Sequence, residues 1–226
     1  MKKETFEKLE NYMLECMKDS AHDKEHIYRV LYSALDIAEK EENVDYDILI
    51  TACLLHDIAR EDQNKNPEIC HAQYGAEKAY KFLIENDFGI DFADKVKYCI
   101  SSHRFRKNNT PETTEAKILF DADKIDVAGT LGIARTLVYQ GAMAEPLYSV
   151  RPDGRVSDGE SDEIPSFFQE YKYKLEKIYS RFYTVRGKEI AEERRKTAIS
   201  FYENMLREVS STYEKGIELL ENIVKL

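Results

Sequence analysis

The sequence lacks any long apolar run. Its longest apolar stretch, residues 48–55, is far shorter than the about 20 residues that a membrane-spanning helix needs. The N-terminal sequence Met-Lys-Lys-Glu-Thr-Phe-Glu-Lys-Leu-Glu is too polar for a signal peptide. We therefore expect no membrane partner and no export from the cytoplasm.

An excess of basic residues is missing as well. Lys and Arg number 33 against 43 Asp and Glu, so the formal net charge is −10. A field of this sign repels nucleic-acid backbones, and no basic run reverses it locally, so nucleic acid is a disfavoured partner. The same field repels small phosphorylated substrates. A phosphate-binding site in this chain therefore needs a metal ion and nearby Arg or Lys.

Cysteine is scarce and scattered. The four cysteines, Cys16, Cys53, Cys70 and Cys99, form no C-x-x-C pair, and two of them lie within apolar helical patterns. Such positions are typical of buried free thiols. The pattern indicates a reducing compartment, the cytoplasm.

Sustained alternation of apolar and polar residues, the mark of a half-buried strand, is also hard to find. Apolar residues instead recur at helical spacing almost throughout, which predicts an all-α fold. Although tryptophan is absent, a hydrophobic fraction of 42% predicts that the chain buries a core of its own. After two N-terminal helices, we predict helices over residues 46–60, 72–85, 92–101, 115–126, 167–182 and 188–214, and a short last helix.

We predict that these helices form one domain over residues 1–226. Its core covers about residues 20–140, and its C-terminal helices cover about residues 167–226. Between them, residues 141–165 are rich in Gly, Pro, Ser and Asp and form too long a segment for a mere connection. We interpret this segment as either a mobile lid or a disordered insertion.

The histidines cluster in the first half of the chain, at His22, His26, His56, His71 and His103. The most specific signal is the adjacent pair His56-Asp57 at the end of the apolar helix predicted over 46–60. Burying an uncompensated carboxylate there costs free energy, and coordination of one cation by both side chains removes that cost. The structural alternative, a helix C-cap, suits the imidazole but not the carboxylate.

Other helices must supply the remaining ligands of such an ion, because neighbouring helix residues point about 100° apart. The candidates are His26, at the start of a helix, and Asp123, within Asp-Ala-Asp-Lys-Ile-Asp. Taken alone, His26 would more often be a structural histidine, and Asp123 would more often be a helix cap or ion-pair partner. Two imidazoles and two carboxylates together suit Mn²⁺, Fe²⁺, Co²⁺ or Mg²⁺ with positions open for water, which indicates a catalytic metal.

The order of these motifs resembles that of a known family. His26-x-x-Arg-Val, then His56-Asp57, then the acidic motif around Asp123 are similar to the HD-domain superfamily of metal-dependent phosphohydrolases, and most of all to small soluble bacterial HD hydrolases. The resemblance implies an HD-domain helical bundle whose metal is held by His26, His56, Asp57 and Asp123. It also implies hydrolysis of phosphomonoesters, phosphodiesters or nucleoside triphosphates.

The same resemblance implies catalytic candidates beyond the ligands. In some HD phosphatases a Glu three residues after the paired Asp assists the water, but here that position is Arg60, and Glu61 follows it. We take Glu61 as a candidate for this role and Arg60 as a candidate for contacting the substrate phosphate, with an ion-paired cation as the alternative for Arg60. His71 and His103 lie where the resembled fold brings side chains toward the metal. Each is a candidate for contacting substrate phosphate or a second metal, with helix capping as the alternative.

Three cations are candidates for binding the substrate, namely Lys124, Arg135 and Arg29. Each is equally interpreted as an ion-paired or surface cation. Arg29 in particular shares a helix face with His26, as Asp126 does with Asp123, so a buried pair between Arg29 and Asp126 is the alternative to a substrate contact.

We predict a metal-dependent phosphohydrolase that acts on a nucleotide or other small phosphorylated metabolite. The family resemblance favours a nucleoside triphosphate pyrophosphohydrolase, with a 5′-nucleotide phosphomonoesterase as the alternative. A non-catalytic HD module that binds metal and nucleotide is the alternative from another class, and the intact ligand set argues against it. The expected partner is the small phosphorylated substrate, and a homodimer stays open.

Overall fold

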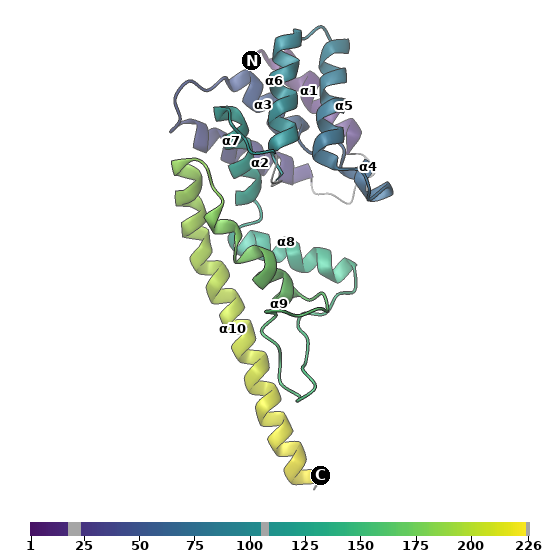
Figure 1. Cartoon of the computed structure of the whole chain (residues 1–226). Coiled ribbons are helices and arrows are strands. Elements are labelled where there is room, and N and C mark those ends of the chain that lie inside the picture. The colour runs from purple at the N-terminus through teal and green to yellow at the C-terminus, as the bar shows by residue number, and fades with distance from the viewer. Residues whose placement is uncertain (18–23, 105–108, 225–226) are drawn as a thin grey trace. The chain divides into compact units, whose positions relative to one another are not determined.

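The structure is a computed structural model that describes residues 1–17, 24–104 and 109–224 (Figure 1). Over these residues the regular elements are all helical, and the β structure is an isolated antiparallel bridge between Val150 and Val156. The all-α prediction is confirmed. Within the same ranges, no helix has the length and apolar character needed to cross a membrane. His22 lies outside the described residues.

The chain divides into two compact units. The first comprises Met1–Asp126 and Phe182–Lys188, and the second comprises Val127–Arg181 and Glu189–Leu226. The prediction that residues 1–226 form one HD domain stays a prediction.

The first unit is a bundle around one central helix (Figure 1). Its helices are α1 (Lys3–Cys16), α2 (Lys24–Ala38), α3 (Tyr46–Leu55), α4 (Arg60–Lys65), α5 (His71–Glu85), α6 (Ile90–Ser102) and α7 (Thr114–Ile125). Helix α3 contacts α1, α2, α5, α6 and α7. Its apolar residues point to nearly all sides, and seven of its ten residues are buried, as a central helix requires. Asp45 caps its start by accepting hydrogen bonds from the backbone N–H groups of Asp47 and Ile48.

The end of α3 differs from the sequence-based prediction. The helix predicted to reach residue 60 ends at Leu55, and a tight turn leads directly into α4. In this turn the N–H of Ile58 donates to the carbonyl of Leu55, three residues back. The N–H of Arg60 likewise donates to the carbonyl of Asp57. Because the turn contains no Gly or Pro, the apolar pattern carries no mark of it. The turn places His56 and Asp57 beyond the helix rather than along its side.

The second unit contains α8 (Gly129–Ala142), α9 (Phe167–Glu170), a π-helical turn (Tyr171–Leu175), a 3₁₀ turn (Ile178–Ser180) and most of α10 (Val185–Val224). The helix predicted over 167–182 is therefore wrong as one α-helix, because the N–H of Glu176 bonds five residues back to Tyr171. The short last helix is also wrong, since α10 continues through it.

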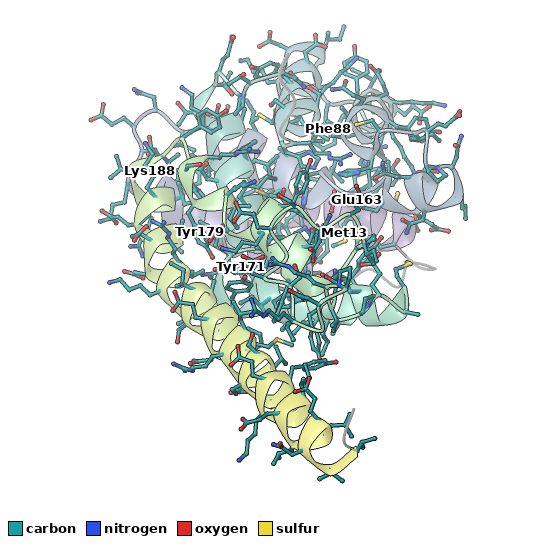
Figure 2. All side chains as sticks on the ribbon, turned by 60° about the horizontal axis from the view of Figure 1, so that its bottom comes forward. Met13, Phe88, Glu163, Tyr171, Tyr179 and Lys188 are labelled. Atoms are coloured by element: carbon teal, nitrogen blue, oxygen red, sulfur yellow. The ribbon has the colours of Figure 1, made fainter. Side chains whose placement is uncertain are left out.

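Tyr171 and Tyr179 both lie beside α10 (Figure 2). The ring of Tyr171 stacks on that of Tyr202, with ring centroids 4.1 Å apart.

The loop between α8 and α9 is a folded part of the second unit. The hydroxyls of Ser149 and Ser157 donate to the carboxylate of Asp162, both at 2.6 Å, and Ser157 is fully buried. Tyr202 of α10 donates from its hydroxyl to the backbone carbonyl of Asp158. The disordered insertion is therefore wrong, and the mobile lid stays a prediction.

Two glycines of α8 give a matched test of the second unit's packing. A Cβ on Gly132 would lie 2.1 Å from the carbonyl oxygen of Val127, whereas a Cβ on Gly141 would meet nothing within 4 Å. Gly132→Ala is expected to destabilise the protein by about 1–3 kcal/mol, because backbone must move. Gly141→Ala is expected to be neutral or stabilising by up to about 1 kcal/mol. Urea unfolding of both variants checks this, and equal midpoints would contradict the packing described here.

Candidate metal centre

Six side chains converge inside the first unit. Helix α2 delivers His26 in its first turn, the turn after α3 delivers His56 and Asp57, and the last turn of α7 delivers Asp123. His71 is the first residue of α5, and His103 directly follows α6. All six are buried. The structure thus brings together the four predicted metal ligands and the two further histidines.

One group of ligand atoms surrounds the Nε2 atom of His26. That atom lies 3.4 Å from Nε2 of His56 and 3.5 Å from Oδ1 of Asp123. It also lies 3.5 Å from Oδ2 of Asp57. Ligands about 2.1 Å from a shared ion are themselves about 3–4 Å apart, so this spacing is that of a coordination shell. We name His26, His56 and Asp123 the first ligand group.

A second group gathers at the other oxygen of Asp57. Its Oδ1 atom lies 3.4 Å from Nε2 of His71 and 3.7 Å from Nε2 of His103. The ligand atoms of these three residues all lie within 4.8 Å of one another. We name them the second ligand group. Asp57 presents one oxygen to each group, in the arrangement of a bridging carboxylate.

Unsatisfied polar atoms are concentrated in the second ligand group. Among the described residues, four buried side-chain N or O atoms have no hydrogen-bond partner. Three of them are Oδ1 of Asp57, Nε2 of His71 and Nε2 of His103. Buried polar atoms in folded proteins nearly always have partners, and each exception calls for an explanation such as an ion. The donor set therefore fits a divalent cation.

The proton positions on His56 and His103 agree with this interpretation. Nδ1 of His56 lies 2.8 Å from the carbonyl oxygen of Cys53, and Nδ1 of His103 lies 2.6 Å from that of Ile100. A carbonyl oxygen only accepts, so each Nδ1 carries the proton. In the neutral ring Nε2 then has a free lone pair, which is what a metal ligand needs.

The centre concentrates negative charge. Burial alone would raise the pKa of Asp57, but Arg60 and His56 hold that pKa well below its usual range. Lys124 and the nearby histidines likewise hold the pKa of Asp123 low against the effect of burial. Both carboxylates are thus ionised at neutral pH.

The imidazoles respond to burial in different ways. Burial lowers the pKa of His56 to about 4 and that of His71 to about 2, so both rings are neutral. Burial also acts to lower the pKa of His26, but hydrogen bonds to the carboxylates of Asp126 and Asp57 outweigh it and raise the pKa to about 9. The field at Nε2 of His26 therefore favours a positive charge.

Three partly exposed cations pair with the buried carboxylates. Arg60 donates to Asp57 at 2.9 Å, and Lys124 donates to Asp123 at 2.6 Å. Arg29 donates to Asp126, so the predicted support pair is present.

Asp126 also connects this pair to the first ligand group. Its Oδ2 atom accepts from Nδ1 of His26 at 2.7 Å.

Two other predicted residues have different surroundings. Glu61 pairs with Lys65 one turn along α4, and Arg135 lies on α8 in the second unit.

Two residues of this region carried no recognisable role in the sequence. Gln63 of α4 contacts His71, eight positions along the chain, and Asp121 contacts Tyr183 and Thr184, more than sixty positions along. Neither contact has a short-range sequence signal. The sequence offers one hint for Asp121, which is a carboxylate on the face of α7 opposite the predicted ligand Asp123.

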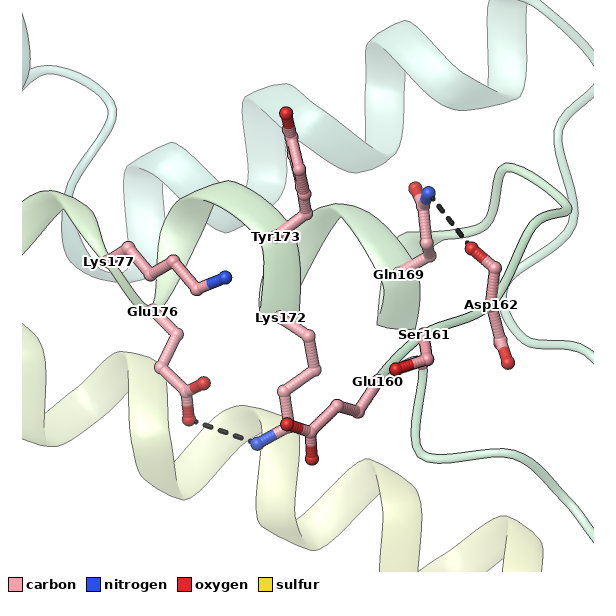
Figure 3. A pocket seen from close by; sticks show the side chains of 9 residues that line it. Glu160, Ser161, Asp162, Gln169, Lys172, Tyr173, Glu176 and Lys177 are labelled. Carbon is pink, nitrogen blue, oxygen red and sulfur yellow. Dashed lines mark hydrogen bonds and ion pairs between the residues drawn. The ribbon is translucent and has the colours of Figure 1, made fainter.

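A cavity in the second unit is the rival location for a site (Figure 3). It measures about 310 Å³ and is lined in part by Lys172, Glu176, Gln169 and Asp162. These side chains already satisfy one another, since Lys172 pairs with Glu176 at 3.0 Å and Gln169 donates to the backbone carbonyl of Asp162. The two ligand groups of the first unit, with their unsatisfied atoms, are the stronger candidate.

Comparison with known proteins agrees with the geometry. A family model of the HD domain matches residues 24–128, which include both ligand groups. YpgQ of Bacillus subtilis is 29% identical over 196 residues, covering 85% of this chain and 86% of YpgQ. The crystal structure of YpgQ in complex with ADP matches with a TM-score of 0.69 at 26% identity, covering 90% of this chain and 97% of that one.

Two further solved structures are similar along nearly their whole length. A predicted HD superfamily hydrolase from an uncultured Thermotogales bacterium is 30% identical, with a TM-score of 0.61, over 89% of this chain and 91% of that one. An HD-superfamily hydrolase from Bacillus thuringiensis is 29% identical, with a TM-score of 0.69, over 92% of this chain and 98% of that one. This chain belongs to the HD superfamily of hydrolases.

Proposed function

We propose that the protein is a divalent-metal-dependent phosphohydrolase. His26, His56, Asp57 and Asp123 would hold a first ion, and Asp57, His71 and His103 would hold a second. The observation that carries this proposal is the set of three buried, unpartnered ligand atoms on Asp57, His71 and His103 beside the first ligand group. Imidazole nitrogens mixed with carboxylate oxygens suit Mn²⁺, Fe²⁺, Co²⁺ or Mg²⁺.

The protein's own side chains have separable tasks in this proposal. A divalent cation in the centre would polarise a phosphoryl oxygen and lower the pKa of a water molecule. Arg60, Lys124 and Arg29 reach the buried carboxylates from partly exposed positions, and they would reverse the repulsion between a chain of net charge −10 and an anionic substrate.

His71 and His103 act as ligands rather than as acids in this proposal. The Nδ1 proton of His103 is engaged by the carbonyl of Ile100, and Nε2 of each ring faces Asp57. A neutral ring with its proton on Nδ1 carries no proton on Nε2, the atom that faces Asp57. Proton donation to a leaving group is therefore not assigned to these two residues. Glu61 is not assigned the role of assisting the water, because Glu61 pairs with Lys65.

We further propose that the substrate is a nucleoside triphosphate, cleaved to the monophosphate and pyrophosphate. The B. subtilis relative binds ADP, and its chain is matched over nearly its whole length. A 5′-nucleotide phosphomonoesterase is the alternative within the class. The cytoplasm is the proposed location, since all four cysteines are free thiols.

A nucleotide panel with Mn²⁺, Co²⁺ and Mg²⁺ tests this function, with pyrophosphate and phosphate quantified separately. We expect pyrophosphate from triphosphates in the presence of Mn²⁺. Phosphate from monophosphates would support the phosphomonoesterase instead. Tight metal and nucleotide binding with no product from any nucleotide would contradict an enzyme and favour a binding module.

The contact between Asp126 and His26 predicts an effect on metal affinity. The charged carboxylate of Asp126 orients His26 and makes its ring a better ligand. Asp126→Asn removes this charge, so we expect affinity for the first ion to fall by about 10–100-fold. Asp36→Asn is the matched control, because Asp36 pairs with Arg186 on the same unit without an imidazole. Calorimetric titration with Mn²⁺ measures both variants. Equal affinities would contradict the role of Asp126.

A further inference from the structure

The side chain of Gln63 is fixed in one orientation between two partners. Its Nε2 donates to the backbone carbonyl of Ile69 at 2.8 Å, and its Oε1 lies 2.6 Å from Nδ1 of His71. The carbonyl of Ile69 only accepts, so the NH₂ end of the amide must face it. The amide oxygen therefore faces His71, and Nδ1 of His71 must carry the proton.

A second group competes for the same nitrogen. Nη1 of Arg104 lies 3.4 Å from Nδ1 of His71. A guanidinium only donates, so a hydrogen bond from Arg104 would require the lone pair on Nδ1 and would move the proton to Nε2. Gln63 and Arg104 thus favour opposite tautomers of one ring. The shorter contact, 2.6 Å against 3.4 Å, belongs to Gln63.

The position of each histidine in its helix explains why His71 needs a side chain for this purpose. His56 and His103 follow the ends of α3 and α6, where carbonyl oxygens one turn back are free to accept from Nδ1. His71 is the first residue of α5, so no helical carbonyl lies one turn behind it. The carboxylate of Asp126 serves His26, and the amide of Gln63 serves His71.

We propose that Gln63 is a positioning residue that sets the tautomer and ring orientation of His71, so that the Nε2 lone pair faces Oδ1 of Asp57. The inference rests on the proposed metal centre for its consequence, the affinity for the second ion. Its primary claim, the position of the proton, concerns the metal-free protein. With Gln63 removed, Arg104 becomes the partner of Nδ1, and the proton moves to Nε2, where it blocks coordination.

Nitrogen-15 NMR of the metal-free protein tests the position of the proton directly. Long-range ¹H–¹⁵N correlations distinguish a protonated Nδ1 from a protonated Nε2. We expect Nδ1 to be protonated in the wild type and in Gln63→Glu, whose carboxylate still accepts. In Gln63→Met we expect Nε2 to be protonated. A protonated Nε2 in the wild type would overturn the proposal, even if Gln63→Met fails to fold. The same tautomer in the wild type and in Gln63→Met would also overturn it.

Calorimetric titration with Mn²⁺ then measures the consequence. We expect Gln63→Met to weaken the second ion by about 10–100-fold, with the first ion unchanged and Gln63→Glu restoring affinity. Gln73→Met is the matched control on α5, because Gln73 donates to the backbone carbonyl of Ser101 rather than bonding to an imidazole. Equal second-ion affinity in Gln63→Met and wild type would overturn the proposed consequence. A wild type that binds one ion only would contradict the two-ion centre while leaving the tautomer result to decide the role of Gln63.

Discussion

Asp57→Asn is expected to abolish retention of both ions and to reduce phosphohydrolase activity by at least about 10³-fold. Among the described residues, Asp57 is the one that presents an oxygen to each ligand group. An amide has no charge and only one oxygen, so it cannot bridge two cations. A metal ion supplies several kcal/mol of transition-state stabilisation, and a loss of about 4 kcal/mol corresponds to about 10³ in rate.

The measurements are metal content after desalting and turnover at saturating Mn²⁺. Asp62→Asn is the matched control, because Asp62 of α4 pairs with Lys78 and both side chains are partly exposed. We expect that variant to keep its metal and its activity. Far-UV circular dichroism should show wild-type helix content in both. Full metal content in Asp57→Asn would contradict the bridging role.

Asp121→Ala is expected to lower the free energy of unfolding by about 2–4 kcal/mol. The carboxylate of Asp121 accepts hydrogen bonds from the backbone N–H groups of Tyr183 and Thr184, at 3.0 and 2.7 Å, and from the hydroxyl of Thr184. Burial raises the pKa of Asp121, which reduces the net benefit of the charge. Removing the acceptor still leaves two inward-facing N–H groups without a partner, at about 1–3 kcal/mol each.

Asp123→Asn is the matched comparison, because Asp123 lies two residues further along the same helix and belongs to the first ligand group. In metal-free protein we expect Asp123→Asn to lower the free energy of unfolding by less than Asp121→Ala does, because the carboxylate of Asp123 bonds to the ammonium of Lys124 rather than to backbone N–H groups. Asp123→Asn should lose metal, whereas Asp121→Ala should keep it. Urea unfolding and metal analysis of the two variants separate these outcomes. Equal unfolding free energies would contradict the structural role of Asp121.

The candidate site was largely accessible from the sequence because its chemistry depends on residue type. An imidazole and a carboxylate side by side at the end of an apolar helix are costly to bury without a cation, whatever the details of the fold. This cost predicts that His56 and Asp57 bind a metal ion, and the structure places His26 and Asp123 beside them. Helix periodicity also suggested the pairing of Arg29 with Asp126, because Arg29 lies three residues after His26 and Asp126 lies three residues after Asp123.

Other features depend on three-dimensional detail that periodicity does not encode. Helix α3 ends at Leu55 although Ile58 and Ala59 continue the apolar pattern. Helix α8 was not predicted, because three glycines weaken its helical propensity. The contact between Gln63 and His71 depends on how the turn between α4 and α5 directs two helices. Such a turn is set by local hydrogen bonds, so no spacing rule reveals it.

Anomalous diffraction from crystals grown with Mn²⁺ tests the central claim most directly. We expect one anomalous peak within about 2.0–2.5 Å of the ligand atoms of His26, His56 and Asp123 and of Oδ2 of Asp57. We expect a second peak at the same range from Oδ1 of Asp57 and Nε2 of His71 and His103. Crystals that hold Mn²⁺ elsewhere, with no peak at the first ligand group, would contradict the assignment of this centre as the metal site of a phosphohydrolase.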